Sequence, residues 1–146
     1  MTITVDTSVF VEMILGQERA QECRSFLDEV AKGRINAVLP HSSIHAIEAM
    51  IRSQKELSGF LKDIETSRGL EIYDTTLLDE QMIPILSEKA GLDFDDSVQF
   101  YVAKRTNSSA IVSFDKHFDG RDIPRREPIQ ILEELRVNPK KAGSRR

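Results

Sequence analysis

Hydrophobic residues follow two alternating patterns along this chain. Runs of four or five β-branched and aliphatic residues are typical of strands that are buried on both faces of a parallel sheet. Longer segments carry apolar residues every three or four positions, which is typical of helices with one buried face. The runs predict strands at residues 2–5, 35–39, 70–73, 110–114 and 128–132. The periodic segments predict helices at residues 9–14, 19–32, 44–51, 54–66, 77–90 and 96–105.

The alternation of strands and helices predicts an α/β fold. We expect a three-layer α/β/α domain around a central, mostly parallel sheet of about five strands, with the strand at residues 2–5 in the middle. Small polar side chains stand before three of the six predicted helices and are expected to cap them: Thr7, Ser8, Ser42, Ser43 and Asp93. Residues 139–146 have the composition of a flexible basic tail, so the domain is expected to span residues 1–138.

Composition narrows the class of protein. The chain has 146 residues, of which 40% are hydrophobic and 30% charged, which is ordinary for one soluble domain. It has neither an apolar run long enough to cross a bilayer nor the start of a secretory signal, so we expect a cytoplasmic protein with no membrane contact. Cys23 is the only cysteine, which excludes an internal disulfide and a cysteine-rich zinc site.

The charge is distributed unevenly. The last eight residues carry four cations and no acids, so residues 1–138 hold 16 basic and 24 acidic groups, a net charge of −8. A body this acidic is a poor general binder of phosphate backbones. A nucleic-acid substrate would therefore need local basic clusters, bound metal cations or a second subunit to offset the repulsion.

Four carboxylates are expected at the carboxyl ends of the predicted strands, the edge at which open α/β sheets bind ligands. Asp6 and Asp115 each follow a strand, Glu48 is expected one turn into a helix, and Asp96 begins one. Carboxylates gathered at one edge repel one another unless a cation neutralises them, and hard oxygen ligands suit Mg²⁺ or Mn²⁺. Such ions bind phosphodiesters and activate water, which is the chemistry of a nuclease.

The order of these residues resembles the PIN domain family of metal-dependent ribonucleases, and particularly its VapC-type toxins. The matching segments are V-D-T-S-V at the start, the isolated Glu48, D-D-S-V-Q-F-Y-V-A-K-R, and I-V-S-F-D-K-H-F-D. The resemblance implies that Asp6, Glu48, Asp96 and Asp115 form a catalytic metal site for RNA hydrolysis, with Ser8 and Ser113 as hydroxyl supports. Ser97 replaces the alanine that is commoner in the family. The toxin branch further implies a homodimer and an antitoxin protein that covers the active site.

Two of these assignments have a neighbouring alternative. Asp95 precedes Asp96 and can take its place, although the seven-residue step to Ala103 favours Asp96. Asp119 lies one helical turn after Asp115 and can share the fourth position. The sequence does not separate a toxin from a housekeeping RNA-processing nuclease. An inactive PIN-like scaffold is disfavoured because all four acids are present.

Each acid also has a structural explanation when it is taken alone. Asp6 and Asp96 can cap helices, Glu48 can pair with Arg52, and Asp115 can form a turn. A metal site is favoured only because all four stand in the family's order. A haloacid dehalogenase is disfavoured because Ser8 stands where it needs a second acid. A response-regulator receiver is disfavoured because it needs acidic and lysine partners that this chain lacks.

Basic and histidine residues give weaker signals. Arg121, Arg125 and Arg126 follow Asp115 and can contact RNA phosphates, or can pair with neighbouring acids. His41 and His45 have zinc-ligand spacing, but the glutamate of an H-E-x-x-H motif is missing, so a structural role is favoured. His117 can contact a substrate phosphate or lie in a surface turn.

Overall fold

The computed structural model describes residues 1–138, and the basic tail predicted for residues 139–146 lies outside this range. Five parallel strands form one sheet in the order β3-β2-β1-β4-β5. They are β1 (Thr2–Val5), β2 (Asn36–Pro40), β3 (Leu70–Tyr73), β4 (Ile111–Val112) and β5 (Arg125–Arg126). The predicted parallel sheet with β1 at its centre is confirmed.

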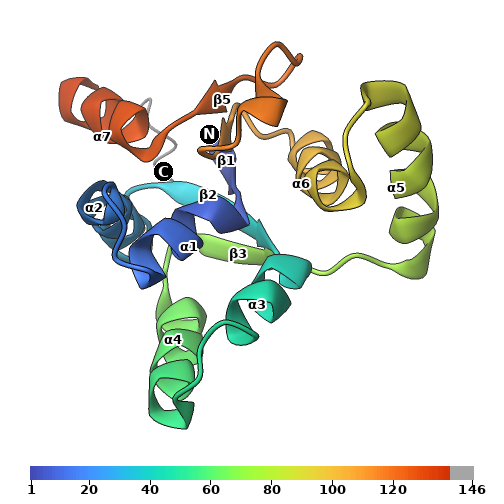
Figure 1. Ribbon diagram of the computed structural model, residues 1–146. Helices are drawn as coiled ribbons and strands as arrows, with labels where there is room; N and C mark the ends of the chain where they lie inside the picture. Colours follow the sequence, from blue (N-terminus) through green and yellow to red (C-terminus); the bar gives the residue numbers. More distant parts are fainter. Residues whose placement is uncertain (139–146) are drawn as a thin grey trace.

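Helices follow or precede each strand and cover both faces of the sheet (Figure 1). They are α1 (Thr7–Ile14), α2 (Ala20–Ala31), α3 (His41–Glu48), α4 (Gln54–Thr66), α5 (Leu77–Ala90), α6 (Phe94–Arg105) and α7 (Pro128–Val137), with a 3-10 turn η1 at Lys116–Phe118. The predicted bounds of α4, β3 and α5 agree with the structure. Asp93 caps α6 by accepting a hydrogen bond from the Asp96 N–H, as expected.

Side chains that alternate along β2 belong to different apolar clusters on the two faces of the sheet. Ala37 and Leu39 of β2 face the core that contains α1, α2 and α7 residues, whereas Val38 packs with Ile83 of α5 and Val98 of α6. Successive strand side chains point to opposite faces, so a strand buried on both faces must be apolar throughout. This confirms the three-layer α/β/α fold.

Three details differ from the sequence predictions. Residues 128–132 begin α7 instead of forming a strand, because Pro128 suits the first position of a helix and Glu127 and Gln130 form a capping box. The helix α3 ends at Glu48 instead of residue 51. Thr7, Ser8, Ser42 and Ser43 do not cap, since α1 and α3 already begin at Thr7 and His41 and neither helix has a side-chain cap.

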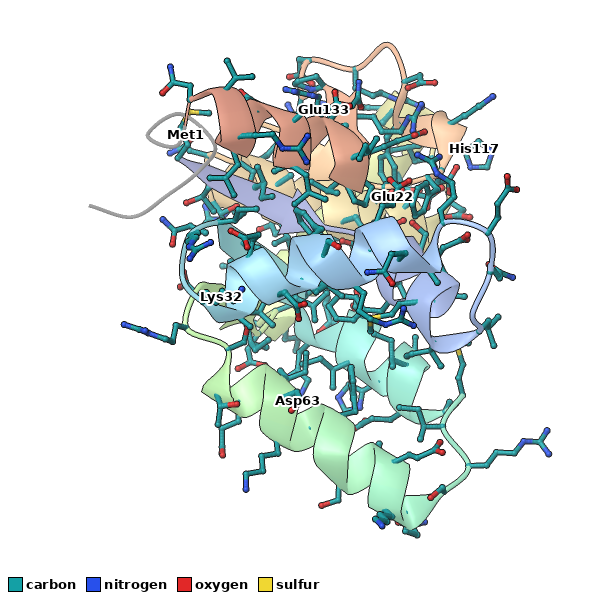
Figure 2. The ribbon with its side chains drawn as sticks, turned by 90° about the vertical axis from the view of Figure 1, so that its left-hand side faces the viewer. Met1, Glu22, Lys32, Asp63, His117 and Glu133 are labelled. Atoms are coloured by element: carbon teal, nitrogen blue, oxygen red, sulfur yellow. The ribbon has the colours of Figure 1, made fainter. Side chains whose placement is uncertain are left out.

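The strand order reverses at β1. The chain moves from β1 outward to β2 and β3, and then returns past β1 to β4 and β5. A crevice opens at such a reversal because the connections leave the two adjacent strands in opposite directions. The segments that follow β1 and β4 therefore flank a natural ligand site. Figure 2 shows Met1, which precedes β1, and His117, which follows β4, at opposite ends of the molecule.

No helix within residues 1–138 is long and apolar enough to cross a membrane.

Gly69 joins α4 to β3 at a close backbone contact, which gives the first prediction. A Cβ atom at Gly69 would lie 2.1 Å from the Ile35 carbonyl oxygen and 2.6 Å from that of Val30. Gly69→Ala should lower the free energy of unfolding in urea by about 2 kcal/mol or more, because β3 must move away from β2. The matched control is Gly59→Ala within α4, where a Cβ atom meets nothing within 4 Å and where alanine should stabilise the helix by about 0.5–1 kcal/mol. Equal effects of the two substitutions would contradict this account.

Candidate functional site

A cleft of about 460 Å³ lies at the carboxyl ends of β1 and β4, between α1, α3 and α6. Five of its side chains are acidic, and no Lys or Arg lines it within the described part of the chain. The acids are Asp6, Glu12, Asp95, Asp96 and Asp115. The negative charge of this cleft is therefore not balanced by a Lys or Arg on its walls.

Asp6 lies deepest among these acids. It occupies the N-cap position of α1, yet its side chain makes no capping hydrogen bond and is 7% exposed. Its Oδ2 atom instead accepts a hydrogen bond from the Ser113 hydroxyl at 2.7 Å. Burial raises the pKa of Asp6 above its ordinary value, although hydrogen bonds from Ser113 and Ser8 oppose the rise. The Asp6 side chain thus bonds to the segment after β4, which a cap of α1 alone does not explain.

Ser113 and Ser8 link the segments after β1 and β4. The Ser113 Oγ atom also accepts a hydrogen bond from the Asp115 N–H at 2.9 Å, and it lies 3.3 Å from the Ser8 Oγ atom. Ser8 in turn accepts a hydrogen bond from the Phe114 N–H at 3.2 Å. The two hydroxyls thereby fix Asp6 and Asp115 relative to each other, as the sequence led us to expect of hydroxyl supports.

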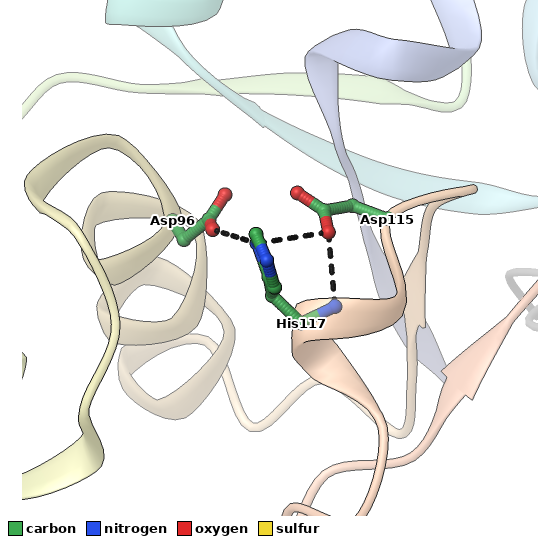
Figure 3. A group of neighbouring side chains, drawn as sticks. All are labelled: Asp96, Asp115 and His117. Carbon is green, nitrogen blue, oxygen red and sulfur yellow. Dashed lines mark hydrogen bonds and ion pairs between the residues drawn. The ribbon is translucent and has the colours of Figure 1, made fainter.

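Asp96 and Asp115 approach each other from α6 and from the turn after β4, with His117 between them (Figure 3). The His117 Nδ1 atom lies 3.1 Å from Asp96 Oδ2 and 3.1 Å from Asp115 Oδ1. Burial, followed by the charges of Asp115 and Asp93, raises the pKa of Asp96 to about 6. The hydrogen bond with Asp96, together with the charge of Asp115, raises the pKa of His117. Burial thus favours the neutral form of Asp96, and the neighbouring carboxylates favour the charged form of His117.

A neutral network joins three helices along another wall of the cleft. The Gln99 Nε2 atom donates to Ser43 Oγ at 2.7 Å and to Thr7 Oγ1 at 3.4 Å, and Thr7 Oγ1 donates to Ser43 Oγ at 2.8 Å. Thr7 follows Asp6 directly, and Gln99 lies one turn after Asp96. The network therefore ties α1, α3 and α6 together beside the acids.

Glu48 is not brought to the cleft with the three aspartates. The α3 side chains that line the cleft are Ser42, Ser43 and Ala46, and Glu48 stands two residues beyond Ala46. Residues two apart on a helix face different directions. The Glu48 Oε1 atom lies 3.2 Å from His45 Nδ1, so the pairing partner is His45 and not the expected Arg52.

Asp95 and Asp119, the alternatives to Asp96 and Asp115, lie in different places. Asp95 and Asp96 both line the cleft, but only Asp96 contacts His117. Asp119 does not line it, because its Oδ1 atom accepts a hydrogen bond from Arg125 Nε at 2.7 Å. Geometry therefore favours Asp115 over Asp119 at the acidic cluster.

The three arginines considered for RNA contact are engaged within the protein. Arg125 also bonds to Glu127 and to the Ser113 carbonyl oxygen, each at 3.0 Å. Arg126 pairs with Glu134 at 2.8 Å, and Arg121 bonds to the carbonyl oxygens of His117 and Ala90. Arg121 and Arg125 thereby support the turn after β4, and Arg126 links β5 to α7.

The histidines His41 and His45 stack with ring centroids 4.8 Å apart, and each contacts a carboxylate, Asp74 and Glu48 respectively. Neither lines the cleft.

Glu12 and Gln99 are among the cleft residues that were not identified from the sequence. Glu12 lies four residues after Ser8 on α1, so both face the cleft, and helical spacing from Ser8 could have indicated it. Gln99 had no comparable signal, because it sits in an otherwise apolar stretch of α6.

The donor set fits a hard divalent cation. Carboxylates from three separate elements line the cleft, and no Lys or Arg lines it within residues 1–138. Asp6 is not part of the group whose ligand atoms lie closest together. Asp96, Asp115 and His117 offer ligand atoms that all lie within 4.8 Å of one another.

Several solved structures are similar to this chain in fold. A toxin-antitoxin complex from Klebsiella pneumoniae has a TM-score of 0.69 at 11% identity, covering 86% of this chain and 97% of that chain. VapC20 from Mycobacterium tuberculosis, a toxin that cleaves the sarcin-ricin loop, has a TM-score of 0.59 at 16% identity, covering 77% of this chain and 89% of that chain. FitAcB from Neisseria gonorrhoeae has a TM-score of 0.56 at 16% identity, covering 87% and 98%.

At these identities the similarities show the fold alone. A search of curated proteins gave no match. The PIN domain family matches residues 3–123, a span that includes Asp6, Asp96 and Asp115. The chain belongs to the PIN domain family.

Proposed function

We propose that this protein is a metal-dependent endoribonuclease that hydrolyses RNA phosphodiester bonds, and that it is the toxin of a type II toxin-antitoxin pair. The observation that carries the enzymatic part is that Asp6, Asp96 and Asp115 line one cleft, which no Lys or Arg lines within residues 1–138. Family membership supports nuclease chemistry. The toxin-antitoxin complex among the similar structures supports the biological role and a cytoplasmic location.

The aspartates are the proposed ligands of Mg²⁺ or Mn²⁺. A divalent ion held there supplies charge to neutralise the phosphodiester and lowers the pKa of a water molecule. Asp6 is held by Ser113, Asp115 is held by the turn after β4, and Asp96 is carried by α6, so three elements fix their relative positions. Hydrolysis forms a bond between the water oxygen and phosphorus and breaks the bond to one ribose oxygen, which leaves with a proton.

The proposed site differs from the one expected from the sequence in its fourth acid, Glu48. Glu48 was expected to ligate or orient a second ion, but its side chain pairs with His45 outside the cleft. Glu12 and Asp95 are the further carboxylates that line it. We assign any second-ion role to these two residues before Glu48.

Cleavage assays give the second prediction. Asp6→Asn should lower metal-dependent RNA cleavage by at least about a hundredfold, because it removes a buried charge that binds the cation while preserving the side chain's shape. Glu48→Gln is the matched control and should retain most of the parent rate. The assay compares structured RNAs and single-stranded DNA in Mn²⁺, Mg²⁺ or excess EDTA.

The outcomes of this assay separate the candidate functions. Cleavage by Asp6→Asn at the parent rate would refute the site. Absence of both cleavage and metal binding would favour an inactive scaffold. A neighbouring reading frame for a small antitoxin would distinguish the toxin from a housekeeping nuclease, and co-purification of its product would test the antitoxin partner directly.

We also propose a homodimer formed through α5. Leu78, Met82 and Ile85 are 68%, 47% and 50% exposed, and their spacing places them on one side of this helix. A second copy is the proposed occupant, because a two-fold axis would bring the same apolar side chains together from both protomers. This supports the dimer that the family resemblance implies.

Light scattering after size exclusion gives the third prediction. The parent protein should have twice the monomer mass, and Met82→Glu should shift it to the monomer because a charge is buried at the interface. Leu61→Glu on α4, at a residue 36% exposed, should leave the mass unchanged. A monomeric parent protein would contradict the dimer.

The raised pKa of Asp96 gives the fourth prediction, on the metal-free protein. Its carboxyl titrates near 3.8 when unfolded and at about 6 when folded, so the folded state binds this proton more tightly. The contribution to stability is therefore fully present below pH 4 and is lost as the pH rises through 6. Urea unfolding should show stability falling across this window, and Asp96→Asn should reduce the fall.

Asp63→Asn on α4 is the matched control and should leave the slope unchanged, because this carboxylate lies outside the cleft. Saturating Mn²⁺ should reverse the trend in the parent protein, since the cation binds the ionised form. An unchanged slope in Asp96→Asn would contradict the prediction.

A further inference from the structure

His117 occupies an unusual place among the three histidines. His41 and His45 each contact one carboxylate, whereas His117 Nδ1 lies 3.1 Å from carboxylate oxygens of both Asp96 and Asp115. These two aspartates come from different elements, α6 and the turn after β4. The nitrogen thus lies between two of the three proposed metal ligands (Figure 3).

The backbone holds the ring in this place on both sides. The His117 N–H donates to Asp115 Oδ1 at 2.9 Å, and the His117 carbonyl oxygen accepts a hydrogen bond from Arg121 Nε at 3.2 Å. The residue lies within η1, which the buried Phe118 anchors to the core that also contains Ile111 and Phe100. A side chain that is 71% exposed is therefore carried by a well-fixed backbone.

The separations agree with those between adjacent ligands of one ion. Ligands at about 2.1–2.2 Å from an octahedral ion lie about 3 Å apart along each edge of the octahedron. The measured Nδ1 to oxygen distances are both 3.1 Å, and the three ligand atoms lie within 4.8 Å of one another. No large rearrangement of the three side chains is needed for them to share a cation.

We propose that His117 is a nitrogen ligand of the divalent ion and makes the site prefer Mn²⁺ over Mg²⁺. This inference rests on the metal site of the proposed function and names its selectivity. Mg²⁺ strongly favours oxygen ligands and octahedral hydration, whereas first-row transition ions bind imidazole nitrogen more readily. A mixed set of two carboxylates and one imidazole therefore favours the transition ion.

The main alternative is that His117 is a counter-ion for the acidic cluster, and this alternative predicts the opposite effect. A cationic imidazole between two carboxylates competes with any bound cation. Removing it would leave affinity unchanged or would increase it, for Mg²⁺ and Mn²⁺ alike. The sign of the change in affinity, and whether it differs between the two ions, thus separates a ligand from a counter-ion.

The test, which is the fifth prediction, measures binding without any activity assay. Mn²⁺ is titrated into the full-length protein by electron paramagnetic resonance, and Mg²⁺ is titrated by calorimetry. His117→Gln should lower Mn²⁺ affinity about tenfold or more, and Mg²⁺ affinity by less than about threefold. Pulsed electron paramagnetic resonance of bound Mn²⁺ should show coupling to ¹⁴N in the parent protein and lose it in His117→Gln.

Two matched variants control for the substitution itself. His45→Gln removes a histidine that is 70% exposed and lies outside the cleft, and Lys116→Gln alters the residue next to His117 within η1. Both should retain the parent's ¹⁴N coupling and its preference for Mn²⁺. Circular dichroism establishes that each variant is folded.

The outcomes distinguish the inference from the function on which it rests. Mn²⁺ binding without ¹⁴N coupling, or equal losses for both ions in His117→Gln, would overturn the role of His117 and leave the metal site standing. Tighter binding of both ions would identify His117 as a counter-ion and would also overturn it. Absence of Mn²⁺ binding by the parent protein would refute the proposed metal site, and the inference would fail with it.

Discussion

The burial of several carboxylates in one cleft is the constraint on which this structure depends. Asp6, Asp96 and Asp115 face one cleft, and burial and neighbouring charge raise the pKa of Asp6 and of Asp96. Folding without a cation must overcome this cost, which the parallel sheet does by fixing β1 and β4 side by side through backbone hydrogen bonds and apolar cores. The buried acids lower the stability of the metal-free protein, but they are already in place to bind a ligand.

Neutral hydrogen bonds hold the acids in place without neutralising them. Ser113 and Ser8 join the segments that carry Asp6 and Asp115, while Gln99 joins Thr7 and Ser43 beside Asp6 and Asp96. Lys or Arg at these positions would form salt bridges and compete with a bound cation. Hydroxyls and amides orient a carboxylate while leaving its charge available.

Basic side chains near the site serve a different purpose. Arg125 binds Asp119, Glu127 and the Ser113 carbonyl oxygen, so it braces the turn that carries Asp115. Since Arg126 is likewise paired with Glu134, the cleft receives little attraction for phosphate from this cluster. In the proposed function, a divalent ion would supply the positive charge for an RNA backbone that these arginines do not supply.

The sequence by itself determined the elements whose signals are local. Apolar runs and helical periodicity were sufficient for β3, α4 and α5, and strand ends located Asp6 and Asp115 because the side chains after parallel strands share one edge. The prediction of a strand at residues 128–132 was wrong, because a short apolar run does not distinguish a strand from a helix. The capping box at the start of α7 favours the helix.

Tertiary structure decided which side chains of each helix face the cleft and which residues far apart in the sequence meet there. Glu48 was expected beside the aspartates. In the structure α3 begins at His41, and the side of this helix that faces the cleft carries Ala46 and not Glu48. The Glu48 side chain pairs with His45 instead. Glu12, Gln99 and His117 reach the site only because α1, α6 and η1 meet at the reversal of strand order. The sequence thus determined the fold and three of the acids, whereas the relative placement of helices, set by packing over long separations, decided which other side chains share their cleft.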